Sequence, residues 1–580
     1  MTVRLPANAT LTIHELLNGI ENAAATHEFD STNCIFADRN ILPAWIGSCS
    51  NLRILRCVGC PIPLKNLLWL LHKRLVQLEV LEFSLVLSHA EADDVTRTVR
   101  QRLSRTPVTL ARSLRRVYTE VGGDVNTVLL CSLLRFCPNV TELHVHVLNG
   151  SFRRCVVQVD KIFASGPQLE RFTFSSDIPP KLEFVPFEIT PFIRQSFVCA
   201  NVNSSRDSSS CVWMRDLTQA LARRVLPSQL VLVFTPGADV LSATISAAVE
   251  RHFWMAVRNL CLVLLPEQSF SAVPEAIADS ACLSGLREFF PVVRYVVELN
   301  VSSFHFSQDL DLTKLLQDAG LVFLQALSTP PCGLRQPRAA WRLAHAFRRL
   351  VDLDVRVERR GYFLRCTLCQ LEFRLDPADM ADLHVAYTES RRNLRRLTLS
   401  GIPNLGPLDF LQRCKVEELR LIDCLCTCHP DFPNLGKLLT SNEKLIFLAI
   451  RQPTLPFATQ QLLVGDSGHP GVCNEHLNVN VTRVKRLEYL CLQTGLSVSW
   501  NIAKTQVGML AALLPKLKYL HVHYWDKENC NVQRLTWMRF DRPECGGRMI
   551  WNATCMLCST ATFIGLSKPR NRGYLSDIMH

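Results

Sequence analysis

Cysteine and histidine are the residues of this chain whose types and spacing could do chemistry. The 580 residues include 24 cysteines and 16 histidines, and both side chains are ligands for zinc. Four groups have the short spacing of a metal-binding knuckle: Cys57/Cys60, Cys366/Cys369, Cys424/Cys426/Cys428 with His429, and Cys555/Cys558. A structural zinc ion needs two such ligand sets close enough to form a tetrahedron.

Cys366-Thr-Leu-Cys369 is the best of these knuckles, but the nearest paired cysteines lie far along the chain. Cys60 and Cys424 each follow an apolar strand motif, where a buried cysteine is a structural residue. We therefore expect inert, buried thiols, no stoichiometric zinc and no other metal or cofactor.

Two histidine pairs, His144/His146 and His521/His523, are spaced two residues apart, so each pair lies on one face of a strand. No carboxylate accompanies either pair at ligand spacing, which favours solvated strand-face histidines. The chain also has no Gly-x-Ser-x-Gly elbow, no phosphate-binding Gly-x-x-x-x-Gly-Lys-Ser/Thr and no His-Glu-x-x-His. We expect no catalytic residues and no enzyme activity.

The charge balance argues against a nucleic-acid partner. Sixty-four basic and fifty-two acidic residues are interspersed, for a net charge of +12. An arginine-rich run between residues 97 and 116 follows Ser88 and three acidic residues, an order that suits a capped, solvated helix. No aromatic residues interleave with these arginines as they do in nucleic-acid-binding modules.

The elements that position these side chains are repeated Leu-x-x-Leu-x-Leu motifs. A strand buried on one face needs apolar residues two apart, and the apolar residue three positions earlier closes the preceding turn. Twelve copies begin at Leu52, Leu78, Val140, Leu169, Val257, Val296, Leu350, Leu394, Val416, Leu445, Leu487 and Leu517. No copy can bury its apolar face alone, so the copies must stack.

Segments with helical apolar spacing, such as residues 64–75 and 126–136, lie between the strand motifs. This alternation resembles leucine-rich repeat proteins of the ribonuclease-inhibitor-like and F-box/leucine-rich-repeat type. The resemblance implies an α/β solenoid with a curved parallel sheet on the concave side and helices and loops on the convex side. The irregular spacing of the copies departs from regular repeats and predicts loop insertions.

Five segments follow from this pattern. We expect a helical N-terminal cap over residues 1–50 and repeats over 51–180. An irregular insertion with a Ser-rich loop occupies 181–256, and repeats resume over 257–525. Residues 526–580 form a C-terminal cap and a basic tail.

The N-terminal segment leaves two interpretations open. Leu5-Pro6 followed by spaced aliphatic residues loosely resembles the start of an F-box, and a simple cap for the first repeat fits as well. No apolar signal segment or membrane-spanning stretch is visible, which predicts a cytoplasmic or nuclear protein. We also expect the protein to be a monomer. An extracellular or endosomal recognition ectodomain is the alternative, because Asn-x-Ser/Thr sequons occur at Asn8, Asn139, Asn149, Asn203, Asn300, Asn480 and Asn552.

Strand register names the residues that could contact a partner, since those between the inward leucines face the opposite side of the sheet. Aromatic and arginine side chains are common interface hot spots, and aromatics collect on the C-terminal repeats. The predicted partner-binding residues are Phe447, Arg451, Tyr489, Gln493, Tyr519, His521 and His523. Burial of the same aromatics by a folded-back C-terminal segment is the competing interpretation. We therefore expect the chain to be a protein-interaction scaffold. The resemblance to F-box/leucine-rich-repeat proteins further implies a substrate-recognition subunit of a ubiquitin ligase, which would bind a cullin-ligase adaptor.

Overall fold

The computed structural model divides into two compact units. Unit 1 comprises residues 1–260 and 280–293, and unit 2 comprises residues 261–279 and 294–580. The structure describes residues 2–5, 10–11, 23–36, 41–60, 64–85, 111–121, 126–147, 156–157, 159–166, 168–176, 181–182, 197–202, 229–234, 251–264, 286–306, 310–336, 339–357, 366–371, 373, 394–403, 405, 416–424, 444–452, 486–526, 531–539 and 547–551.

Unit 1 is built on parallel strands that pair with one another in chain order. β1 pairs with β3, and the pairing continues strand by strand through β5, β6, β7, β8, β10, β12 and β13. Two short parallel pairs, β2–β4 and β9–β11, lie outside this sheet. The strands span Thr2–Arg4 (β1), Thr10–Leu11 (β2), Glu28–Asp30 (β3), Ile35–Phe36 (β4), Ile54–Cys57 (β5), Val80–Leu85 (β6), Arg116–Val121 (β7), Glu142–Val147 (β8), Val156–Val157 (β9), Arg171–Ser176 (β10), Lys181–Leu182 (β11), Phe197–Val202 (β12) and Gln229–Phe234 (β13).

Unit 2 repeats this arrangement from β15 to β22, with each strand parallel to the next. The chain then reverses, because β23 and β24 add to the sheet in antiparallel orientation. The strands are Glu298–Asn300 (β15), Ala326–Thr329 (β16), Asp352–Arg356 (β17), Arg396–Ser400 (β18), Glu418–Ile422 (β19), Phe447–Gln452 (β20), Tyr489–Val498 (β21), Tyr519–Asp526 (β22), Asn531–Arg539 (β23) and Gly547–Trp551 (β24); β14 (Asn259–Leu264) lies where the units meet in the sequence.

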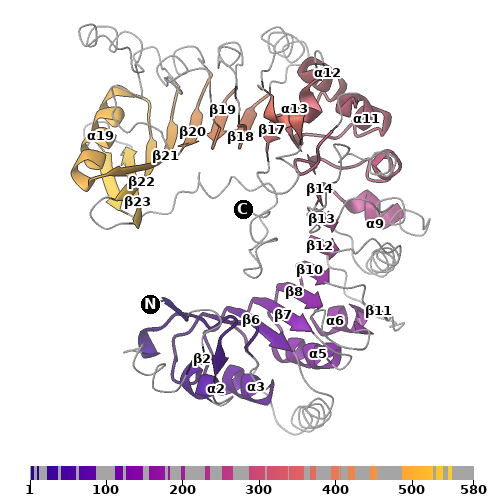
Figure 1. Cartoon of the computed structure of the whole chain (residues 1–580), viewed down its shortest axis with the longest axis vertical. Coiled ribbons are helices and arrows are strands. Elements are labelled where there is room, and N and C mark those ends of the chain that lie inside the picture. The colour runs from indigo at the N-terminus through magenta and orange to yellow at the C-terminus, as the bar shows by residue number, and fades with distance from the viewer. Residues whose placement is uncertain are drawn as a thin grey trace. The chain divides into compact units, whose positions relative to one another are not determined.

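Helices cover one side of the strands in each unit (Figure 1). In unit 1, α5 packs on α6 and α2 on α3, and in unit 2, α11 packs on α12 and α13 on η3. The helices span Ala23–Ala25 (η1), Ile41–Ile46 (α2), Leu64–Lys73 (α3), Asn126–Phe136 (α5), Val159–Ser165 (α6), Arg251–Ala256 (α9), Leu312–Asp318 (α11), Pro331–Leu334 (η3), Ala339–Ala346 (α12), Thr367–Gln370 (α13) and Trp500–Leu513 (α19).

The core lies between the sheet and these helices, and the repeated leucines supply it. Leu397 and Leu419 are both 0% exposed and stand opposite one another in the register of β18 and β19. All twelve predicted motifs coincide with strands. The predicted α/β class and parallel sheet are therefore confirmed.

Several strands do not match the apolar motif, because a residue with a buried hydroxyl stands at a position where the motif has an apolar residue. Thr119 in β7 and Thr329 in β16 occupy inward positions and are fully buried, and Ser31 does the same directly after β3. Their hydroxyls donate to backbone carbonyls, as Ser31 Oγ does to Arg56 O at 3.3 Å. A threonine fills nearly the volume of a valine, so the packing survives while the sequence pattern is lost.

One position of the repeat has a left-handed backbone after four of the strands, β3, β5, β18 and β19. Four residues after the central leucine, Asn33, Gly59, Gly401 and Asp423 have φ of 59°, 73°, 68° and 50°. Glycine, asparagine and aspartate tolerate this conformation best. A Cβ at Gly401 would also meet the carbonyl oxygen of Val357. Each of these four residues lies in the turn or bend that follows its strand.

Two predicted segments differ from the structure. The described part of residues 1–50 is not mainly helical, because β1 and β3 extend the parallel sheet ahead of β5. The expected insertion at 181–256 contributes β12 and β13 to the same sheet. Both were missed because these strands lack the full leucine motif. Residues 97–110 of the arginine-rich run, the Ser-rich loop from residue 203 and the basic tail lie outside the described residues. The described end of the run, residues 111–116, is not helical, because Arg116 begins β7.

No helix among the described residues is long and apolar enough to cross a membrane.

Leu397→Asp is expected to lower the free energy of unfolding by about 3 kcal/mol or more, because it buries an unpaired charge. Urea denaturation followed by circular dichroism measures this change. Val322→Asp is the control, since Val322 is an exposed residue and its charge stays in water. Equal losses in the two variants would mean that Leu397 does not lie in the core.

Candidate functional site

The polar face of the sheet in unit 2 is the candidate functional site. It consists of the residues that alternate with the buried leucines in β15 to β23. In-register pairing places these residues in rows that cross the strands. The rows toward the C-terminal end carry the residues predicted from the sequence.

One row is aromatic and apolar. Phe447, Tyr489, Tyr519 and Met538 stand opposite one another in successive strands. Phe447 is buried, the two tyrosines are half-buried and Met538 is exposed. A parallel row contains Arg451, Gln493, His523 and Arg534, in which both arginines are exposed.

Between these two rows the side chains are small or buried. Cys491, His521 and Thr536 stand opposite one another, and each is almost inaccessible to solvent. His521 packs edge-to-face on His523 with ring centroids 4.3 Å apart, and its Nδ1 lies 3.7 Å from Cys491 Sγ. The middle row is therefore the packed base of this face.

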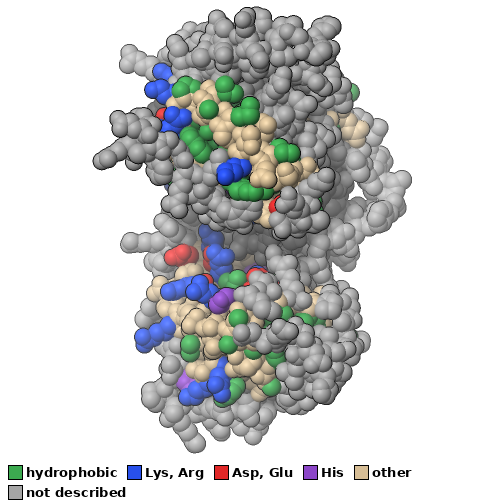
Figure 2. All heavy atoms as spheres, turned by 90° about the vertical axis from the view of Figure 1, so that its left-hand side faces the viewer, with side chains coloured by type: hydrophobic (Ala, Val, Ile, Leu, Met, Phe, Trp, Pro, Cys, Tyr) green, Lys and Arg blue, Asp and Glu red, His purple; other side chains and the backbone are tan. Residues whose placement is uncertain are grey.

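Further apolar side chains are exposed at the same end of unit 2. Trp525, at the end of β22, is 42% exposed, and Ile502 and Met509 project from α19. Figure 2 shows hydrophobic side chains beside lysine and arginine over this end of the unit. Apolar groups rimmed by positive charge are typical of protein-binding surfaces.

For two of the predicted contact residues, the predicted exposure to solvent is wrong. Phe447 and His521 were expected to be accessible, but both are buried. The Arg420 guanidinium lies 5.1 Å from the centroid of the Phe447 ring and covers it. His521 is enclosed by Cys491 and His523. The other five, Arg451, Tyr489, Gln493, Tyr519 and His523, are exposed or half-buried, and their role in partner binding stays a prediction.

Nearer the middle of unit 2, the polar face carries a ladder of ion pairs. Arg396 of β18 contacts Asp352 of β17 at 3.2 Å and Glu418 of β19 at 2.7 Å. Burial raises the pKa of Asp352, and burial together with the Asp352 charge raises that of Glu298. One arginine thus holds together carboxylates from neighbouring strands.

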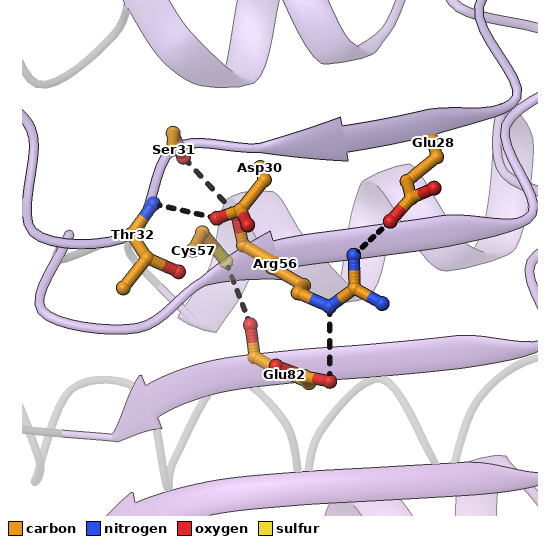
Figure 3. Close-up of polar contacts among 7 residues, drawn as sticks. All are labelled: Glu28, Asp30, Ser31, Thr32, Arg56, Cys57 and Glu82. Atoms are coloured by element: carbon orange, nitrogen blue, oxygen red, sulfur yellow. Dashed lines mark hydrogen bonds and ion pairs between the residues drawn. The ribbon is translucent and has the colours of Figure 1, made fainter. Parts of the chain in front are cut away.

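Unit 1 uses the same arrangement on its own polar face (Figure 3). Arg56 of β5 forms ion pairs with Glu28 of β3 and, at 3.2 Å, with Glu82 of β6. Asp30 accepts a hydrogen bond from the backbone N–H of Thr32 at 3.1 Å. The sequence pattern did not reveal these ladders, because acid and base lie one repeat apart in the chain.

Two groups of side chains bring metal-ligating atoms together. Cys491, His521 and His523 form one group, and His305, Cys332, Cys366 and Cys369 form the other; within each, the ligand atoms lie within 4.8 Å of one another. In the first group the two imidazole rings are closer than the roughly 5 Å that tetrahedral ligands of one zinc ion adopt. That geometry favours ring packing. The second group has the composition of a closed structural site.

The remaining cysteine knuckles have different surroundings. Cys60 and Cys424 are buried, as expected, and their Sγ atoms donate to backbone carbonyls of Ser31 and Leu399. Burial raises the pKa of Cys57 well above its usual range. Cys426, Cys428, His429, Cys555 and Cys558 lie outside the described residues.

The other expected histidine pair is not simply solvated. His144 packs edge-to-face on Tyr118 with ring centroids 4.7 Å apart. Burial, with a smaller contribution from His146, lowers the pKa of His144 to about 3. His144 is therefore uncharged at neutral pH and is a packing residue of β8.

Comparison with known proteins finds similarity among solved structures. No protein-family model matches the chain, and no curated protein matches it. Among solved structures, the leucine-rich repeat-containing protein LegL7 from Legionella pneumophila is similar at 12% sequence identity, with a TM-score of 0.30. The match covers 64% of this chain and 90% of that chain. A score of this size does not establish a shared fold.

Arg396→Met is expected to destabilise unit 2 by about 1 kcal/mol at pH 7, because it leaves neighbouring carboxylates without their shared cation. The pKa values of Asp352 and Glu298, already raised, should rise further. A carboxylate whose pKa is raised in the folded state binds its proton more tightly there than in the unfolded chain. The loss relative to wild type should therefore shrink as the pH falls from 7 to 4.

Denaturation of both proteins across this pH range measures the difference. Lys518→Met is the control, because the Lys518 side chain is 60% exposed and its ion pair with Glu488 is screened by water. A loss at Arg396 that stays constant with pH would contradict the ladder as its origin.

Proposed function

We propose that this chain is a non-enzymatic scaffold that binds a protein partner through the C-terminal part of the polar face in unit 2. The observation that carries the proposal is the row of Tyr489, Tyr519 and Met538, which register places side by side on one face. Tyrosine supplies a large contact area at low cost in conformational entropy.

The chemistry of this face defines the partner. Met538 and Trp525 are exposed and offer apolar contact, while Arg534 lies on the same face, opposite His523. A complementary protein would present an apolar side chain to the tyrosine row and a carboxylate to Arg534. Half-buried tyrosines next to exposed arginine are the usual composition of an interface hot spot.

The proposed scaffold has no catalytic activity. On the described polar face, the carboxylates Asp352 and Glu418 are engaged with Arg396. The buried His521 lies against Cys491 and His523. These residues act as structural partners of one another, which supports binding and not catalysis as the function of the face.

The finer assignment rests on the repeat pattern. We interpret each unit as a stack of leucine-rich repeats, since successive parallel strands share one register, and in each unit two strands are followed by a left-handed residue at the same position. Such stacks present extended binding surfaces. A role as a ubiquitin-ligase substrate receptor follows only from the sequence resemblance, and affinity capture that recovers cullin-ligase adaptors would support it.

Replacement of Tyr489 and Tyr519 by Ala should weaken partner capture about tenfold or more and leave the fold intact, as the loss of hot-spot aromatics does. Quantitative affinity capture with mass spectrometry identifies the partner and measures the loss. Circular dichroism of the double variant checks its folding.

Two controls locate the effect. Tyr295→Ala removes a half-buried tyrosine of unit 2 that precedes β15 and stacks on Phe323. Arg115→Ala with Arg116→Ala alters unit 1. Both should retain the partner. Equal losses in all three variants, or unfolding of the Tyr489/Tyr519 variant, would place the contact surface elsewhere.

A further inference from the structure

We infer that unit 2 contains a structural zinc site of the Cys₃His type, formed by His305, Cys332, Cys366 and Cys369. The site is separate from the proposed binding face and does not depend on it. It replaces the expectation of inert thiols at Cys366 and Cys369. Four ligands from a single compact cluster are what structural zinc requires.

The topology of the sheet explains why these residues meet. β15, β16 and β17 are parallel neighbours in register, so the three segments that follow them leave the sheet at the same edge. His305 follows β15 and Cys332 lies in η3 after β16. Cys366 directly precedes α13 and Cys369 lies within it, after β17. Residues far apart in the sequence are thereby adjacent in space.

These three segments do not use the left-handed turn that follows β3, β5, β18 and β19. The position that is left-handed at Asn33, Gly59, Gly401 and Asp423 falls on Ser303, Pro331 and Val357, which are not left-handed. The chain instead forms η3 and α13. All three connections supply metal-ligating side chains.

The ligand atoms have the separations of a metal site. His305 Nδ1 lies 3.3 Å from Cys369 Sγ, and all four ligand atoms lie within 4.8 Å of one another. Tetrahedral zinc with ordinary bond lengths places sulfur atoms roughly 3.8 Å apart and sulfur and nitrogen roughly 3.6 Å apart. Side-chain adjustments of about 1 Å would close the tetrahedron. His305, Cys332 and Cys369 are buried and Cys366 is partly exposed, so solvent reaches one side only.

The immediate surroundings hold each ligand in place. Asn300 Oδ1 accepts hydrogen bonds from the N–H and hydroxyl of Ser302, which turns the chain toward His305. His305 is flanked by the buried and stacked rings of Phe304 and Phe306.

Arg335 fixes the Cys366–Cys369 knuckle by donating to the carbonyls of Leu368 and Leu371, both at 2.8 Å. Such outer contacts orient metal ligands before the metal binds.

The hydrogen bonding of Cys332 differs from that of the inert cysteines. Cys60 and Cys424 act as donors to backbone carbonyls. Cys332 Sγ instead accepts a hydrogen bond from the backbone N–H of Phe306 at 3.2 Å. An N–H donor directed at sulfur stabilises a thiolate, the form that binds zinc.

The test is elemental analysis of the full-length chain produced with zinc in the medium and purified without chelators. We expect Cys332→Ser, and separately Cys366→Ser with Cys369→Ser, to lower the zinc content by one ion per chain. Cys137→Ser is the control, because Cys137 is a buried cysteine that belongs to none of the candidate metal-ligand groups, and the variant should keep the wild-type zinc content. Substitution with cobalt(II) should give the absorption of a tetrahedral thiolate complex in the wild type and the control only.

A chelator experiment on the wild-type protein keeps the test decisive if the cysteine variants fail to fold. Removal of zinc should lower the melting temperature, and added zinc should restore it. The inference is overturned if the wild-type chain lacks zinc and does not change its melting temperature on zinc addition. It is also overturned if zinc persists unchanged in the variants, or if intact mass and peptide mapping show a disulfide among these three cysteines.

Discussion

In-register pairing of parallel strands is the constraint on which the rest of this structure depends. Once Leu397 lies opposite Leu419, every residue of β18 is assigned to one face of the sheet. A shift of one residue would exchange the buried and exposed sets. The leucines on the helical side therefore determine where the arginines, tyrosines and cysteines of the other positions lie.

The same register explains how charge is handled on the polar face. Side chains directly opposite one another in neighbouring strands are close enough to interact, and like charges there would repel. Asp352, Arg396 and Glu418 alternate in sign across three strands, as do Asp30, Arg56 and Glu82 in unit 1. Because the charges alternate in sign, each side chain in the row lies opposite a partner of opposite charge, and the repulsion between like charges is avoided.

Strand positions could be read from the sequence wherever the apolar motif was complete. β7 and β16 were not found, because a buried threonine stands at one inward position. Exposure was predicted correctly for residues such as Arg451, and wrongly for Phe447 and His521, whose cover comes from neighbouring strands. The Cys₃His group could not be found from spacing, since only Cys366 and Cys369 are close in the chain.

The reversal of chain direction after β22 has a consequence for assembly. A stack of identical parallel strands ends in an edge that another parallel strand can extend, so copies of such a chain risk joining end to end. β23 instead pairs with β22 in antiparallel orientation through eight residue pairs, and β24 follows in the same sense. Antiparallel ladders alternate close and wide hydrogen-bond pairs, whereas parallel ladders are evenly spaced. The hairpin thereby occupies the hydrogen-bonding edge of β22 to which a parallel strand of another copy would have to pair.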